Sequence, residues 1–337
     1  MSKLATAMVR TVAVLVKAGD YSLPIPAAVA AAAAARDVSL SVGETAAAVG
    51  PCDAICWVPG IPASELSRCF AENPECKWVH CYSAGVDSLR TFLPEVAARD
   101  GAALTNGRGA FSSSLAEYAL ACILHFNKQV PRWQANGSTQ NWDPFRMKVV
   151  KGQTLGLVGY GDIAQATAKL ARAFGMRVIA TRRDPSKADG ADLDAAYGNS
   201  PEARLEVFRQ ADHVVCSLPD AAGTKDFCGA AEFAAMKPTA TFVSIGRGAA
   251  VDEAALAQAL REDAIAGAAL DVFKTEPLPE TDPLWGLAAE GKLLVTAHNA
   301  DRTDDYFELG WAVWLKNLEA IMDGKAPATV VDPGKGY

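Results

Sequence analysis

The chain has 337 residues, of which 50% are hydrophobic and 21% are charged, so it can bury more than one core and is too apolar to be disordered. Its net charge of −7 and isoelectric point of about 5.2 exclude a basic surface for nucleic acid or for an anionic membrane. No segment has the length and apolarity of a transmembrane helix, and a cytoplasmic protein is expected.

The eight cysteines do not form a recognisable metal motif. Five of them lie in the first 81 residues, and Cys52 and Cys56 have neither a zinc-type spacing nor a histidine pair beside them. We therefore expect free thiols that pack as small hydrophobic side chains, and no metal.

Apolar runs alternate with helix-length amphipathic stretches, which is typical of βαβ units and a parallel sheet. In the first block, strands are predicted at Thr11–Lys17, Val38–Val42, Asp53–Val58 and Trp78–Cys81. Helices are predicted at Ala27–Arg36, Ala63–Ala71 and Ser113–Lys128.

A second block begins near Val150. Six strands are predicted there, at Thr154–Gly159, Met176–Thr181, His213–Leu218, Thr241–Ile245, Ile265–Leu270 and Leu293–Thr296. Its helices include Asp162–Phe174 and Asp252–Arg261, and a last helix, Thr303–Met322, should pack back on the first block. The fold class is α/β, with two Rossmann-like, doubly wound parallel-sheet domains and the active site in the cleft between them.

A glycine motif follows the first strand of the second block. Gly159-Tyr160-Gly161-Asp162-Ile163-Ala164 comes directly after an apolar run and opens a helix, which is G-x-G-x-x-A in its required strand–turn–helix context. The glycines allow a tight turn and close approach of a pyrophosphate to the helix N-terminus. This motif predicts a dinucleotide site.

The end of the next strand indicates which dinucleotide binds. NAD-selective sites carry an acid there for the ribose 2′-hydroxyl, but here Arg182 holds the position and Arg183 follows it. A guanidinium binds a 2′-phosphate through charge-assisted hydrogen bonds, so NADP(H) is predicted. The alternative is that both arginines belong to a solvated loop.

Three further strands end in polar residues that can take part in chemistry. Arg247 follows one apolar run, Asp271 and Glu276 follow the next, and His298 follows the last. Ligands of open α/β sheets bind beyond the carboxyl ends of the strands, so these side chains should converge. Taken singly, each could be a surface arginine, a turn acid or a core histidine.

With the glycine loop, these segments resemble the D-isomer-specific 2-hydroxyacid dehydrogenase family, and the nearest members are NADP-dependent glyoxylate/hydroxypyruvate (2-oxo acid) reductases. The resemblance extends to Ser83-Ala84-Gly85-Val86-Asp87, Thr105-Asn106-Gly107-Arg108-Gly109, Ala116-Glu117-Tyr118 and Val330-Val331-Asp332. It implies a substrate-binding domain of residues 1–106 and 300–337, an NADP-binding Rossmann domain of residues 107–299, and a homodimer.

The resemblance also implies roles for single residues. Arg247 would hold the substrate carboxylate and polarise the oxo group, His298 would donate the proton, and Glu276 would orient the imidazole. The substrate would bind Ser83, Ala84, Gly85, Val86, Arg247 and His298. The cofactor would bind Gly159, Tyr160, Gly161, Asp162, Ile163, Thr181, Arg182, Arg183, Leu218, Pro219, Ile245, Gly246 and Asp271, the last through the nicotinamide carboxamide.

Some features depart from the family pattern. Asn299-Ala300-Asp301-Arg302 adds charge after His298 where relatives have apolar and small residues. Trp133 and Trp142 lie in the segment that reaches towards the neighbouring subunit in relatives. His80 is a candidate for the pocket wall, whereas His125 and His213 are predicted to be structural.

Two other functions remain open. Some proteins of this fold are dinucleotide-sensing corepressors, although no basic or disordered extension supports recruitment of a partner. An NAD-linked dehydrogenase working in the oxidative direction is the nearer rival, and Arg182 argues against it.

Overall fold

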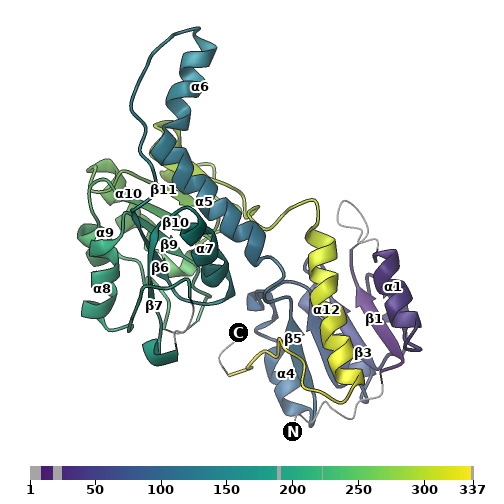
Figure 1. The fold of residues 1–337 in the computed structure, drawn as a ribbon. Helices are drawn as coiled ribbons and strands as arrows, with labels where there is room; N and C mark the ends of the chain where they lie inside the picture. Colours follow the sequence, from purple (N-terminus) through teal and green to yellow (C-terminus); the bar gives the residue numbers. More distant parts are fainter. Residues whose placement is uncertain (1–8, 18–24, 188–190, 222, 335–337) are drawn as a thin grey trace. The chain divides into compact units, whose positions relative to one another are not determined.

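The computed structural model describes residues 9–17, 25–187, 191–221 and 223–334. The chain divides into two compact units, residues 1–111 with 303–337 and residues 112–302 (Figure 1). In the described residues, no helix is long and apolar enough to cross a membrane.

The first unit is built on a parallel five-stranded sheet in the order β2-β1-β3-β4-β5. Its strands are β1 (Thr11–Leu15), β2 (Ser39–Gly43), β3 (Ala54–Trp57), β4 (Trp78–Cys81) and β5 (Ala103–Asn106). Its helices are α1 (Ala27–Ala34), α2 (Ala46–Val49), α3 (Ala63–Glu72), α4 (Leu93–Ala98) and α12 (Tyr306–Met322). The four predicted strands are present and a fifth, β5, was missed, because only Ala103 and Leu104 of its four residues are apolar.

Helix α12 completes this unit, as its apolar face predicted. It lies against α1 (Figure 1), and the Trp314 ring stacks on Trp78 of β4 at 5.9 Å between centroids. Trp311, Trp314 and Leu318 are all fully buried. The helix begins at Tyr306, three residues later than predicted.

The second unit contains a parallel seven-stranded sheet in the order β12-β11-β10-β9-β6-β7-β8. Its strands are β6 (Thr154–Val158), β7 (Arg177–Thr181), β8 (Ala195–Tyr197), β9 (His213–Cys216), β10 (Thr241–Ser244), β11 (Gly267–Leu270) and β12 (Leu293–Val295). Its helices are α5 (Ser112–Lys128), α6 (Val130–Ser138), α7 (Asp162–Ala173), α8 (Pro201–Gln210), α9 (Ala230–Ala235), α10 (Glu253–Arg261) and α11 (Leu284–Ala289).

The strand order of this sheet positions the site. Six strands were predicted and seven are present, because β8 is a three-residue, half-buried edge strand. The chain order reverses between β6 and β9, where Val158 pairs with Cys216. Crevices for dinucleotides form at this kind of switch point, beyond the carboxyl ends of the strands.

The position of the central strands in the core explains why their sequences are continuous apolar runs. Both faces of the central strands are covered, and every residue of β6 and β9 is buried. All eight cysteines are buried free thiols, which confirms their predicted role as packed side chains.

Candidate active site

The loop after β6 has the geometry of an anion site at a helix start. Gly159 adopts a φ of +88°, which disfavours any residue with a Cβ, and its N–H donates to the Thr181 hydroxyl at 3.0 Å. Helix α7 begins after Gly161, which has no side chain to cap its first N–H groups. A Cβ at Gly161 would meet no heavy atom within 4 Å. A helix start with no capping side chain and with space beside Gly161 fits a pyrophosphate.

Other predicted cofactor residues end the neighbouring strands. Leu218 and Pro219 follow β9, and Ile245 and Gly246 follow β10. A Cβ at Gly246 would lie 2.4 Å from the Leu218 carbonyl oxygen, so the two loops are in contact. Leu218 and Ile245 are buried and give this edge of the sheet an apolar floor.

The end of β7 carries a cation where an acid would select NAD. Arg182 is half-buried, its N–H donates to the Tyr197 carbonyl at 2.8 Å, and its guanidinium donates to the Lys187 carbonyl. The next acid along the chain, Asp184, accepts from the Ser186 hydroxyl and N–H, and the first of these bonds lowers the pKa of its carboxyl. The Asp184 carboxylate therefore bonds within its own turn, and Arg182 is the charged residue directly after β7.

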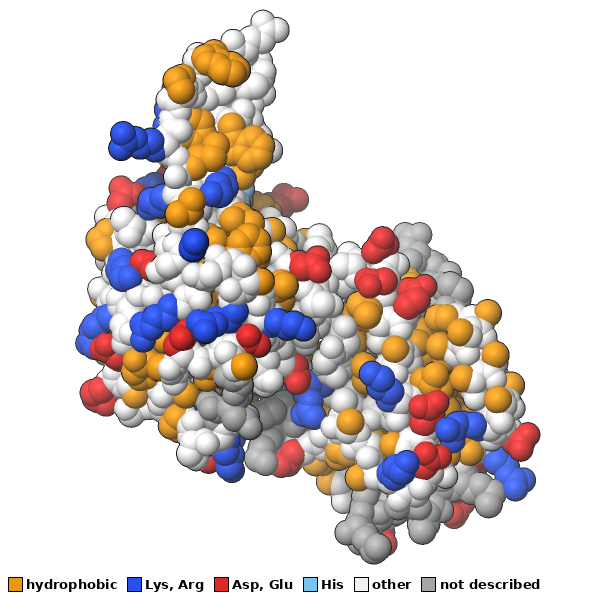
Figure 2. Space-filling model, in the orientation of Figure 1, with side chains coloured by type: hydrophobic (Ala, Val, Ile, Leu, Met, Phe, Trp, Pro, Cys, Tyr) orange, Lys and Arg blue, Asp and Glu red, His pale blue; other side chains and the backbone are white. Residues whose placement is uncertain are grey.

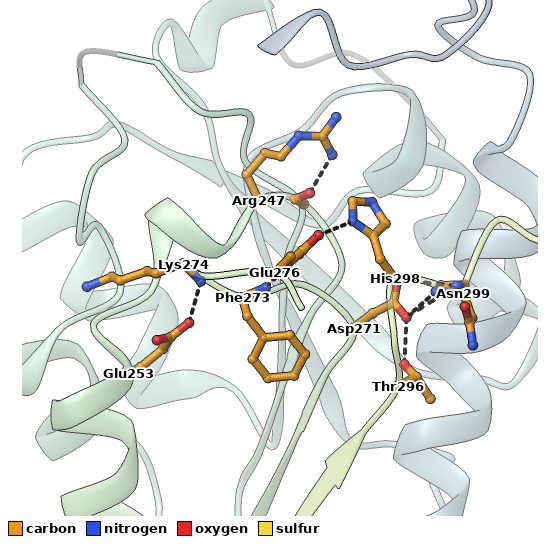
Figure 3. Close-up of polar contacts among 11 residues, drawn as sticks. Arg247, Glu253, Asp271, Phe273, Lys274, Glu276, Thr296, His298 and Asn299 are labelled. Atoms are coloured by element: carbon orange, nitrogen blue, oxygen red, sulfur yellow. Dashed lines mark hydrogen bonds and ion pairs between the residues drawn. The ribbon is translucent and has the colours of Figure 1, made fainter. Parts of the chain in front are cut away.

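His298 and Glu276 form a pair at the ends of two adjacent strands. The Nδ1 atom of His298 lies 2.9 Å from Oε2 of Glu276 (Figure 3). The other carboxylate oxygen accepts the N–H of Phe273 at 2.9 Å, which fixes the carboxylate against its own loop. Because a carboxylate only accepts hydrogen bonds, Nδ1 of His298 must carry the proton in this bond. The other ring nitrogen, Nε2, is then the atom that can face a small molecule. Both side chains are more than one-third exposed, so a small molecule can reach them.

Arg247 follows β10 and shares this end of the sheet (Figure 3). Its guanidinium is half-buried and donates to the Gly246 carbonyl at 2.8 Å. The next residue, Gly248, is packed so closely that a Cβ would lie 1.9 Å from the Phe273 carbonyl carbon. Glycine at 248 thus brings the Arg247 turn against the loop that carries Glu276.

Asp271 is buried, with an exposed fraction of 1%, and organises the turn around His298. Its carboxylate accepts from the Thr296 hydroxyl at 2.6 Å and from the N–H groups of Asn299 and Ala300. Its main-chain carbonyl accepts the N–H of His298 at 2.9 Å. This bonding to the turn was not predicted, because Thr296 carries no motif signal of its own.

The loop between β11 and Glu276 is anchored on its outer side by charged residues. The N–H of Lys274 donates to Glu253 at 2.7 Å, and the ammonium of Lys274 pairs with Asp226. Burial raises the pKa of the Glu253 carboxyl.

Burial also raises the pKa of Asp301, one of the charged residues after His298 that depart from the family pattern.

The predicted substrate loop lies in the first unit, after β4. The Ser83 hydroxyl donates to the Gly85 carbonyl at 2.7 Å, and the side-chain amide of Asn106 donates to the Ala84 carbonyl at 2.6 Å. With these carbonyls bonded inside the unit, the loop has a fixed shape. The sequence placed Asn106 in a family motif but did not predict this hydrogen bond, which depends on the pairing of β4 with β5.

Two buried histidines have structural roles. His80 was a candidate for the pocket wall, and this was wrong: its side chain is fully buried and bonds the Thr105 hydroxyl at 2.8 Å. His213 is confirmed as structural, since its ring nitrogens bond Thr241 and Gln153. Burial lowers the pKa of His80 to about 3 and that of His213 to about 4.

Comparison with known sequences gives consistent relatives. The family model for the D-isomer specific 2-hydroxyacid dehydrogenase, NAD binding domain, matches residues 120–300. A glyoxylate reductase of Aeropyrum pernix is 32% identical over 275 residues, which are 78% of this chain and 78% of that protein.

Solved structures agree with the sequence comparison. A D-isomer specific 2-hydroxyacid dehydrogenase from Xanthobacter autotrophicus, in complex with NADPH and MES, has a TM-score of 0.79 at 26% identity, covering 98% of this chain and 100% of that one. A protein of the same family from Aeromonas salmonicida also has a TM-score of 0.79 at 26% identity, covering 96% and 99%.

Proposed function

Because the chain belongs to the D-isomer specific 2-hydroxyacid dehydrogenase family, we propose that it reduces a small 2-oxo acid to the D-2-hydroxy acid with NADPH. The Glu276–His298 pair carries the proposal, because it sets a proton donor beside Arg247 in the same sheet as the glycine loop. Glyoxylate and hydroxypyruvate are the first substrates to consider, given the glyoxylate reductase relative.

The bound nicotinamide would supply the hydride that adds to the carbonyl carbon. Arg247 would bind the substrate carboxylate and the oxo oxygen, drawing electron density from the carbon that accepts the hydride. Protonated on both ring nitrogens, His298 would give its Nε2 proton to that oxygen and become the neutral Nδ1–H imidazole, so that one hydride and one proton complete the hydroxy acid. Glu276 would accept the Nδ1 hydrogen bond throughout and hold the ring in the orientation that this transfer needs.

NADPH is favoured over NADH by the end of β7. Arg182 offers a guanidinium there, and the carboxylate of Asp184 is already bonded to Ser186. A 2′-phosphate would meet a cation at the position directly after β7. The relative from Xanthobacter autotrophicus was solved with NADPH, which supports the same choice.

The two units would bind different ligands. The unit of residues 112–302 carries the glycine loop and the Arg247–Glu276–His298 set and would hold the cofactor, as proposed for residues 107–299. The N–H groups of Ala84, Gly85 and Val86 would form a nest for the substrate carboxylate, in the unit proposed for substrate binding.

An apolar arm supports a homodimer. Helix α6 and the segment that follows it expose Trp133 and Trp142, the latter with 95% of its surface, together with Met147 and Val149. Figure 2 shows hydrophobic side chains gathered on this arm. Large exposed apolar groups of this kind are typical of an interface, and a second copy of the chain would cover them.

The test is steady-state oxidation of NADPH and of NADH with glyoxylate, hydroxypyruvate, pyruvate, phenylpyruvate and a longer aliphatic 2-oxo acid. Turnover with NADPH is expected, and every acid in the panel except glyoxylate, whose product is achiral, should give a D-configured product. The ranking of the substrates indicates the size of the pocket. Tight NADPH binding without turnover on any acid would point to a sensor. A preference for NAD⁺ and a 2-hydroxy acid would support the oxidative alternative.

A further inference from the structure

A chain of hydrogen bonds runs from helix α5 to the turn that carries His298. The Tyr118 hydroxyl lies 2.7 Å from the Thr296 hydroxyl, which donates to the Asp271 carboxylate at 2.6 Å. Burial raises the pKa of the Tyr118 hydroxyl, so it is protonated and able to donate.

The direction of these bonds follows from counting protons. The Thr296 hydroxyl has one proton, and the carboxylate of Asp271 can only accept it. Tyr118 must therefore be the donor to Thr296. Each hydroxyl then has one defined orientation, and loss of the Thr296 hydroxyl would break both bonds and leave a buried carboxylate with fewer donors.

The same carboxylate holds the turn after β12. It accepts N–H groups from Asn299 and Ala300, while the Asp271 carbonyl accepts the N–H of His298. His298 adopts a φ of +53°, a left-handed conformation that costs a non-glycine residue about 1 kcal/mol or more. The bonds to Asp271 offset this cost and keep the ring directed at Glu276.

We infer that Tyr118 and Thr296 are positioning residues that hold His298 in its proton-donating geometry through Asp271. This inference rests on the proposed reductase function for its catalytic consequence, but its structural part does not. Neither residue needs to touch the substrate, because both act through the turn.

The first experiment compares Thr296→Val, Thr296→Ser and Tyr118→Phe with the wild-type enzyme. Thr296→Val keeps the shape but removes both hydrogen bonds, so kcat should fall about 10–100-fold with little change in KM for NADPH. Thr296→Ser should stay within about 3-fold of wild type, and Tyr118→Phe should lose about 3–10-fold. The solvent deuterium isotope effect on kcat should rise in Thr296→Val, because proton transfer becomes slower.

The matched control is Thr241→Val. Thr296 is half-buried and Thr241 is buried, and the Thr241 variant likewise removes a threonine hydroxyl that bonds a side chain. The Thr241 hydroxyl bonds His213 at 2.7 Å, at the opposite ends of the strands. This variant should lower stability without changing the solvent isotope effect. Equal isotope effects in the two valine variants would reduce Thr296 to a stabilising residue.

A second measurement is independent of turnover. The chain has four histidines, so their ring resonances can be followed one by one in NMR spectra. Thr296→Val and Tyr118→Phe should shift or broaden His298 and leave His80, His125 and His213 unchanged. An unmoved His298 resonance, or no rescue by Thr296→Ser, would overturn the inference. If wild type turns over no 2-oxo acid, the proposed function fails, and the NMR result still decides the positioning role.

Discussion

The Nδ1 atom of His298 lies 2.9 Å from Oε2 of Glu276, and Oε1 of the same carboxylate accepts the Phe273 N–H at 2.9 Å. One oxygen of the Glu276 carboxylate is thus fixed by a main-chain N–H of its own loop, while the other oxygen bonds the His298 imidazole. This arrangement leaves Nε2 as the ring atom that meets a substrate, and it makes the pair the first place to test by mutation.

His298→Ala should lower kcat by about 100-fold or more, because general acid catalysis contributes on this scale. The dissociation constant for NADPH should change less than about 3-fold, since the glycine loop and Arg182 lie on other strands. Stopped-flow turnover and NADPH fluorescence titration measure the two quantities. Near-normal turnover would remove His298 from the mechanism.

Arg182→Asp should raise KM for NADPH by about 10–100-fold and improve the relative use of NADH. The variant loses charge-assisted hydrogen bonds to the 2′-phosphate and adds a repulsive carboxylate. Arg177→Asp is the matched control, because it makes the same charge change at the opposite end of β7, where Arg177 bonds Gln210. An unchanged ratio of NADPH to NADH efficiency in Arg182→Asp would refute the cofactor assignment.

Gly248→Ala should destabilise the protein by about 1–3 kcal/mol and lower kcat. The new Cβ would lie 1.9 Å from the Phe273 carbonyl carbon, so the Arg247 turn must move away from the Glu276 loop. Gly286→Ala is the control, since a Cβ there meets nothing within 4 Å and α11 should gain stability. Urea titrations and kcat for both variants test this, and equal effects would contradict the close-packing argument.

Stability should fall on mild acidification because of His80 and His213. Their pKa values of about 3 and about 4 lie below the value near 6.5 of an unfolded histidine, so the unfolded chain binds these protons more readily. The contribution of the two neutral histidines to the free energy of unfolding is complete above pH 6.5. It is lost as the pH falls towards 4 for His213 and towards 3 for His80. Between pH 6.5 and 5, each should remove roughly 1–2 kcal/mol from the free energy of unfolding.

Urea titrations at pH 6.5 and pH 5 measure this effect before most carboxylates titrate. His213→Gln should reduce the pH dependence in the unit of residues 112–302, because His213 lies there. A wild-type free energy of unfolding that is equal at the two pH values would rule the explanation out.

Trp142→Ser should weaken self-association if the arm is a dimer interface. Light scattering coupled to size exclusion should give twice the chain mass of 35.4 kDa for wild type and a larger monomer fraction for the variant. Trp285→Ser, at an exposed tryptophan in α11, is the control. A monomeric wild type at micromolar concentration would refute the dimer.

Local signals in the sequence predicted much of this molecule. The glycine loop depends on a strand, a turn and a helix that are contiguous in the chain, and the structure has them at β6, Gly159 and α7. Arg247, Glu276 and His298 each follow an apolar run, and parallel strands carry their ends to one edge of the sheet. The strand β5 was missed because it has only two apolar residues, and β8 because it is a half-buried edge strand without valine, leucine or isoleucine.

By itself, the sequence determined the α/β class, the dinucleotide loop and the residues available for chemistry, because each rests on a contiguous pattern of side chains. The tertiary structure decided how those residues are held. Tyr118 meets Thr296 across 178 residues of chain, Thr296 meets Asp271 across 25, and Gly248 touches Phe273. Such contacts depend on strand register and on packing between distant segments, which no local pattern records.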